Sequence, residues 1–211
     1  MRTILVPLAL VLALAACGRG QSQPDAAERP ADAKRPVSMK AVTIARIQAR
    51  NPGTAIKVIS AAVGADGVIG PQQSGYGANR SLPVSWTVAA GAQSYALVIE
   101  DPDAPGGAPF VHWLIWNIPG DRTSLPEGLP NTATLAAPEG ALQGRNDAGS
   151  SGYFGPRPPP GPAHHYHVQV FALDRILPVP AGAELPALRE AMTDHVLASG
   201  DLIGTYKAPR S

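Results

Sequence analysis

Three separated segments of this 211-residue chain carry side chains that could bind a small charged ligand. In the first, Asp101 and Asp103 stand two residues apart in a stretch rich in proline and glycine. The second contains His112, and the third combines glycines and prolines with His164, His165, Tyr166 and His167. Carboxylates accept hydrogen bonds, whereas imidazole and phenol groups can also donate them. Together, these residue types indicate a polar binding site.

The third segment also has backbone features that suit an anion. Gly155 lets the main chain approach a ligand closely, and Pro156 begins a proline run that stiffens the loop. Successive N–H groups in such a loop can form a concave anion site. The same loop could equally be a rigid surface loop, and the two aspartates could simply close an Asx-type turn.

Metal and catalytic sites are less well supported by these segments. In a strand only His165 and His167 would share a face, and two ligands fall short of the three or four that zinc needs. We therefore expect no metal and no cofactor. The chain has no Gly-x-Ser-x-Gly nucleophile elbow. We expect a protein that is not an enzyme, with a small hydrolase that uses the Asp/His cluster as an open alternative.

The N-terminal segment has the pattern of an export signal. Arg2 precedes the apolar run 4–14, which is too short to span a bilayer as a helix. The run ends in Ala-Ala-Cys17-Gly18 and resembles the lipobox of bacterial lipoproteins, in which the cysteine is acylated. Cys17 is the only cysteine, so acylation would leave no free thiol in an exported protein. We expect a signal peptide over 1–16.

The remaining organisation follows from composition. Residues 17–50 are expected to form the acylated cysteine and a flexible tether, and 51–211 a single globular domain. The predicted location is the bacterial cell envelope, attached to the membrane through the lipid anchor. Because Gly18 and not Asp follows the cysteine, we expect the outer membrane, facing the periplasm. The net charge is +1 without a basic stripe, which excludes nucleic acid as a partner.

Short alternating apolar runs predict a mostly β domain. They predict strands over 56–60, 84–88, 95–100, 113–118, 166–173 and 202–206. A helix is predicted over 187–198, where apolar residues recur every three or four positions and Gly200 could end it. Residues 42–49 could form a helix or a strand. We therefore expect a β-sandwich with a peripheral C-terminal helix.

Several motifs, in order, resemble the phosphatidylethanolamine-binding protein (PEBP) family, in particular its bacterial Raf-kinase-inhibitor-like branch. They are Asp101-Pro102-Asp103-Ala104-Pro105, His112-Trp113, Gly144-Arg145-Asn146-Asp147, Gly155-Pro156-x-Pro158-Pro159, His164-x-Tyr166 and Gly204-Thr205-Tyr206. The resemblance implies a β-sandwich with a small rim pocket for phosphate-like groups or phospholipid heads. Carried over by position, the pocket residues are Asp101, Asp103, His112, Gly155, Pro156, His164 and Tyr166. A homodimer is a further possibility that the resemblance implies.

The chain departs from the family pattern at several positions, among them Leu82, where Ser81-Leu82-Pro83 stands for the family's serine-proline-proline element. His165 replaces the arginine that commonly stands between the histidine and tyrosine of the third motif, and Arg157 and Pro160 alter the loop before it. The leading hypothesis is an exported lipoprotein that binds a small phosphate- or headgroup-like anion in the rim pocket. An inhibitor of a protease or host protein, acting on that protein target through the proline-rich loop, is an alternative.

Overall fold

The computed structural model describes residues 55–210, which form two antiparallel sheets and one α-helix. The predicted signal peptide (1–16), the whole of the predicted segment 17–50 with Cys17, the tether and residues 42–49, and residues 51–54 of the predicted domain lie outside the described residues. The small sheet has the order β1-β2-β5, with β1 Val58–Ile59, β2 Val84–Trp86 and β5 Ser124–Leu125. A short 3-10 helix, η2, spans Pro71–Gln73. Within residues 55–210, no helix is long and apolar enough to cross a membrane.

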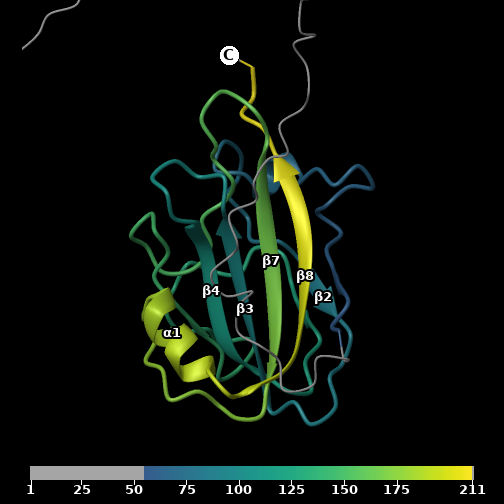
Figure 1. Cartoon of the computed structure of the whole chain (residues 1–211), viewed down its shortest axis with the longest axis vertical. Coiled ribbons are helices and arrows are strands. Elements are labelled where there is room, and N and C mark those ends of the chain that lie inside the picture. The colour runs from purple at the N-terminus through teal and green to yellow at the C-terminus, as the bar shows by residue number, and fades with distance from the viewer. Residues whose placement is uncertain (1–54, 211) are drawn as a thin grey trace, which may run out of the picture. The chain divides into compact units, whose positions relative to one another are not determined.

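The larger sheet has five strands in the order β6-β4-β3-β7-β8. Their bounds are β6 Leu142–Gln143, β4 Phe110–Pro119, β3 Ser94–Asp101, β7 His164–Leu173 and β8 Val196–Tyr206. Figure 1 shows β4, β3, β7 and β8 side by side, with α1, Leu185–Met192, near one end of the sheet. The predicted fold class, a mostly β sandwich with a peripheral helix, is confirmed.

Apolar side chains cover both faces of the large sheet. On one face Tyr95, Leu97 and Ile99 of β3 belong to a core shared with the small sheet. On the other, Ala96 and Val98 pack in a second core with residues of α1. Successive residues of a strand point to opposite faces, and both faces of this sheet are covered by a core. Every residue of β3 is therefore buried, and the strand is a rigid base for the loops at its end.

The C-terminal helix is shorter than predicted, and the last strand is longer. The prediction of a helix over 187–198 was wrong beyond Met192, where α1 ends, and β8 begins at Val196. Asp194 takes a left-handed φ of 63° between them. Val196 then pairs with Leu173 of β7, so hydrogen bonds to a neighbouring strand replace the helical ones. Helical spacing alone could not reveal this partner.

Gly200 has a different role from the predicted helix stop. It lies inside β8, where a Cβ atom would stand 1.9 Å from the carbonyl oxygen of Ile56. The amide of Ile56 donates to the carbonyl of Ser199 at 3.0 Å, and Ala55 forms a parallel bridge with Ser199, so this segment lies close alongside β8. Glycine within a strand often marks such a close backbone approach.

Four strand ends meet at one edge of the large sheet. The end of β3 at Asp101 pairs with the start of β4 at Phe110, and His164 at the start of β7 pairs with Tyr206 at the end of β8. In Figure 1 this is the upper edge, where the arrowhead of β8 lies. The loops 102–109 and 144–163 connect strands at this edge, so it brings the three polar segments of the sequence together.

Candidate functional site

A cavity of about 340 Å³ lies at this edge, within the size range of small-ligand pockets. Three of the seven predicted site residues line it: Asp101, His112 and His164. They come from β3, β4 and β7, three segments that are far apart in the sequence. The rest of the lining is mainly apolar and consists of Ala104, Pro105, Phe110, Phe154, Arg157, Pro158 and Pro159.

A β-bulge directs His112 into the cavity. Ile99 pairs with Trp113 and the next residue, Glu100, pairs with Val111, so His112 is an extra residue between two pairs. Trp113 packs in the core of the small sheet, whereas Val111 packs on the opposite face. His112 lines the cavity and contacts Tyr166, which belongs to the same core as Trp113. Bulges of this kind re-aim side chains beside binding sites.

Aromatic rings and one carbonyl hold the His112 imidazole in place. Its ring stacks on Phe154 with centroids 5.9 Å apart and lies edge-on to Tyr166 at 5.1 Å. Its Nδ1 lies 2.6 Å from the carbonyl oxygen of Phe154. Burial lowers the pKa of His112 below its usual value, although the bond to this carbonyl opposes the shift. The ring is therefore neutral at neutral pH.

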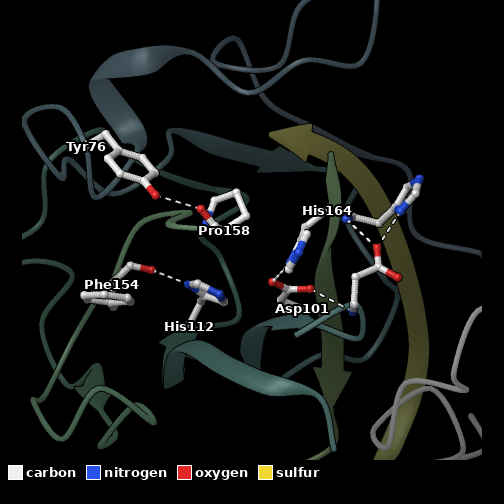
Figure 2. A network of polar contacts seen from close by, with 8 residues as sticks. Tyr76, Asp101, His112, Phe154, Pro158 and His164 are labelled. Atoms are coloured by element: carbon white, nitrogen blue, oxygen red, sulfur yellow. Dashed lines mark hydrogen bonds and ion pairs between the residues drawn. The ribbon is translucent and has the colours of Figure 1, made fainter. Parts of the chain in front are cut away.

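His164 is bonded to the buried carboxylate of Asp101. Its Nδ1 lies 2.8 Å from Asp101 Oδ2, and both side chains are almost wholly buried. The other oxygen, Oδ1, accepts the backbone N–H of Asp103 at 2.8 Å and so closes an Asx-type turn. Figure 2 shows His164 and Asp101 facing the His112–Phe154 pair across the site.

Asp103 is directed elsewhere. Its Oδ2 accepts the backbone N–H of His165 at 2.9 Å and lies 2.7 Å from the ring Nδ1 of the same residue. Burial would raise the pKa of Asp103, but the hydrogen bonds from His165 outweigh it and hold the pKa below its usual value. His165 stands where the family commonly has arginine, and its bonds anchor the loop after β3. Asp103 is not among the residues that line the cavity.

Gly155 and Pro156 lie behind the cavity wall. The amide of Gly155 donates to Asn79 Oδ1 at 2.6 Å, and the carbonyl of Pro156 accepts the amide of Gly75 at 2.9 Å. A Cβ on Gly155 would stand 2.2 Å from the carbonyl oxygen of Gln73. The Gly155 amide is therefore committed to the protein, and this glycine permits close packing of two loops.

Tyr166 lies beneath His112 and is not among the residues that line the cavity. The residue is 1% exposed. Its hydroxyl lies near the Asp101 carboxylate but forms no hydrogen bond within the described part of the chain. Burial, aided by the Asp101 charge, raises the pKa of the Tyr166 phenol far above its usual value, so the hydroxyl stays protonated. As a neutral phenol it can donate one hydrogen bond and can also accept.

The rim carries a cation whose contribution the sequence reasoning did not anticipate. Arg157 lines the cavity, and its guanidinium carbon lies 5.7 Å from the ring centroid of Tyr76. The Tyr76 hydroxyl donates to the carbonyl of Pro158 at 2.7 Å, so the tyrosine also ties down the proline-rich loop (Figure 2). In the sequence, Tyr76 stands between two glycines in a turn, which could have suggested a role in binding. Its partner Arg157 lies 81 residues further along the chain, so the pairing could not be predicted.

Another hollow, of about 520 Å³, lies between η2 and the loop that contains Glu127. Its main polar feature is Gln73, which donates to Glu127 at 2.6 Å. It lacks histidine, so its chemistry is poorer than that of the smaller cavity. Among residues 55–210, no group of three or more His, Cys, Asp or Glu side chains could hold a metal ion.

Comparisons with known proteins agree with the ordered motifs. The profile of the phosphatidylethanolamine-binding protein family matches residues 49–207. A "UPF0098 protein" of Methanothermobacter thermautotrophicus is 46% identical over 132 residues, which cover 62% of this chain and 85% of that protein. The "Putative lipoprotein LppC" of Mycobacterium tuberculosis is 36% identical over 95% of this chain and 92% of its own length. The crystal structure of E. coli YbcL, described as a member of the mammalian PEBP family, superposes with a TM-score of 0.68 at 30% identity and covers 74% of this chain and all of YbcL.

Proposed function

The chain belongs to the phosphatidylethanolamine-binding protein family, and on that premise we propose that it binds a small phosphate- or headgroup-like anion in the cavity at the sheet edge. The observation that carries the proposal is the convergence of Asp101, His112 and His164 on one cavity. Each lies near a strand end and is itself buried, so the three groups are held in place before a ligand arrives. Such preorganisation reduces the entropy lost on binding.

Arg157 supplies the attraction for an anion. It is a permanent cation, whereas the pKa of His112 is lowered by burial, and the Asp101 carboxylate is already bonded to His164. The apolar lining from Phe110, Phe154 and the prolines favours a ligand with a compact apolar part beside its charge. Because such a ligand makes few contacts, we expect binding free energies of about 4–6 kcal/mol, which correspond to millimolar to tens-of-micromolar affinity.

The lining favours binding over catalysis. None of the residues that line the cavity is serine, threonine or cysteine, so no side chain with a common nucleophilic hydroxyl or thiol stands beside the histidines. We propose that the protein turns over neither esters nor phosphoesters. A hydrolytic rate that survives repurification and disappears in His112→Ala would instead favour the small hydrolase.

We also propose that the domain is attached to the cell envelope through an acylated Cys17. Two observations support this: the Ala-Ala-Cys17-Gly18 sequence after an apolar run, and similarity along 95% of the chain to a protein named as a lipoprotein. The anchor would keep the cavity near a membrane surface. That position suits a ligand that derives from a lipid headgroup as well as one that is free in the compartment.

The binding proposal is tested by titrating the full chain with inorganic phosphate and following ¹H–¹⁵N NMR signals. Saturable shifts should appear in residues of the cavity, and His112→Ala should weaken binding by about tenfold or more, since a hydrogen bond to a charged group contributes roughly 1.5–3 kcal/mol. The matched control is His195→Ala, because His195 forms a similar pair with Asp174 outside the cavity. No saturable shift in the wild type, or equal weakening by both substitutions, contradicts the proposal.

A further inference from the structure

The hydrogen bond of His112 fixes which ring nitrogen carries its proton. Its Nδ1 lies 2.6 Å from the carbonyl oxygen of Phe154, and a carbonyl oxygen can only accept. Nδ1 must therefore be the protonated nitrogen. A neutral imidazole has one N–H, so Nε2 of His112 carries a lone pair and acts as an acceptor.

The same reasoning applies to His164. Its Nδ1 faces Asp101 Oδ2 at 2.8 Å, and Oδ1 of that carboxylate already accepts the amide of Asp103. An ionised carboxylate offers only acceptors, so Nδ1 of His164 carries the proton. Whenever the His164 ring is neutral, its Nε2 is also a lone-pair acceptor.

Both acceptor nitrogens belong to rings that line the cavity. In Figure 2 the His112 ring is bonded to Phe154 on one side and presents its other edge toward Asp101 and His164. Within residues 55–210, neither Nε2 has a hydrogen-bond partner, whereas both Nδ1 atoms do. The polar floor of the cavity is therefore rich in acceptors and poor in donors when its histidines are neutral.

This floor repels the lone pairs of a fully deprotonated oxyanion. A hydrogen bond between an anion oxygen and Nε2 requires one proton between them, which must come from the ligand or be taken up by the ring. Burial opposes uptake by His112, and the charge of His164 would oppose it as well, whereas the Asp101 and Asp147 charges favour it. The other ionisable groups that face this region are Tyr166 beneath the ring and Arg157 at the rim.

Building on the proposed function, the geometry points to a narrower ligand class: oxyanions that carry a bound proton which they can donate in a hydrogen bond. Inorganic phosphate and phosphomonoesters belong to this class, because a protonated P–O–H group donates to Nε2 while another oxygen faces Arg157. Sulfate has the same size and tetrahedral shape but carries no proton at neutral pH. A phosphodiester, such as the headgroup of an intact diacyl phospholipid, also lacks one. The cavity therefore selects free phosphate and monoesters over both.

The test compares matched probes on the full chain at about pH 6, near the second pKa of about 6 of phosphomonoesters. Titrations use inorganic phosphate against sulfate, and methyl phosphate against dimethyl phosphate. We expect each protonated probe to bind at least about tenfold more tightly than its partner, because one hydrogen bond to a charged group separates them. Methyl phosphate binding should weaken by up to about tenfold for each unit of pH above 6, as one linked proton requires.

A variant changes the donor pattern directly. His112→Gln places an amide near the position of Nε2, and an amide can donate without taking up a proton. The preference for phosphate over sulfate should shrink toward unity in His112→Gln and remain unchanged in His165→Gln, whose ring is bonded to Asp103 outside the cavity. Circular dichroism establishes that both variants are folded, and the wild-type comparison stands without either.

The outcomes separate this inference from the proposed function. If sulfate and dimethyl phosphate bind as tightly as their partners, the cavity binds anions without regard to their proton, and only the inference fails. If dimethyl phosphate alone binds, the headgroup of an intact lipid is the favoured ligand and the inference is overturned. If no probe binds the wild type, both proposals fail.

Discussion

His164 and His165 are consecutive residues of β7, yet their imidazoles bond to two different aspartates on opposite faces of the sheet. His164 is buried against Asp101 in the cavity, and His165 is bonded to Asp103 outside it. Strand alternation separates the faces, and the turn after β3 supplies a carboxylate to each. One histidine thus belongs to the candidate site and its neighbour to the support of a loop.

This relationship predicts different effects for two alanine substitutions. His164→Ala should weaken phosphate binding by roughly tenfold or more, since it removes a polar group of the cavity and leaves Asp101 without its partner. His165→Ala should change the affinity by less than about twofold, but lower the free energy of unfolding by about 1 kcal/mol, because the bond from the ring to Asp103 is lost while the bond from the backbone N–H remains. Isothermal titration and urea unfolding measure the two effects. Equal loss of affinity in both variants would show that the face assignment does not govern binding.

The cation at the rim gives a second prediction. Arg157→Ala should weaken phosphate binding by about two- to fivefold at low ionic strength, and the effect should fade as salt is added, because an exposed charge is screened. Arg175→Ala is the control, since Arg175 follows β7 at the opposite end of the sheet and lies near Asp174. If both arginine variants bind phosphate as the wild type does, Arg157 makes no electrostatic contribution to the site.

The third prediction concerns the loop behind the cavity. Gly155→Ala should lower the free energy of unfolding by about 1–3 kcal/mol, because its Cβ would meet the backbone of residues 73–75 at 2.2–2.8 Å and force two loops apart. Ala163→Ser, at an exposed position of the same connection, should be close to neutral. Urea unfolding measures both. A Gly155→Ala protein as stable as the wild type would mean that this packing can relax without cost.

Of the residues that line the cavity, Asp101, His112 and His164 were predicted, because the resemblance to the family carries its pocket positions over to them. Their motifs also stand next to apolar runs, and such runs end at sheet edges. It could not predict the bulge that directs His112, because an extra residue in β4 is defined only by its pairing with Ile99 and Glu100. Nor could it separate Asp101 from Asp103, because the turn that diverts the second carboxylate is closed by the first. The extent of α1 was wrong for a similar reason, since β7 decides where β8 begins.

Burial of His112 predicts how stability depends on pH. Its pKa is lowered in the folded protein, so the unfolded chain takes up a proton near pH 6.5 when the folded protein does not. The contribution of His112 to stability is present above this pH and is lost as the pH falls through it. Thermal unfolding between about pH 8 and pH 5.5 should show a smaller decline in His112→Gln than in the wild type. Parallel declines would mean that other groups control the acid sensitivity.

The last prediction concerns the anchor, which rests on Cys17 alone. Acylation of the modified N-terminal cysteine would add acyl chains, and each chain contributes about 0.8 kcal/mol of membrane-binding free energy per buried methylene. Two or three chains make the attachment stable where one does not. Wild-type cells fed a labelled fatty acid should therefore yield a labelled protein that sediments with membranes, and Cys17→Ser should abolish the label. Gly18→Ala is the matched control, because it changes the neighbouring residue but keeps the thiol. Because the thiol that would carry the acyl chains is lost, Cys17→Ser should also release the processed domain from membranes, or leave an uncleaved precursor. Equal labelling and sedimentation of the wild type and Cys17→Ser would rule out a lipid anchor at this residue.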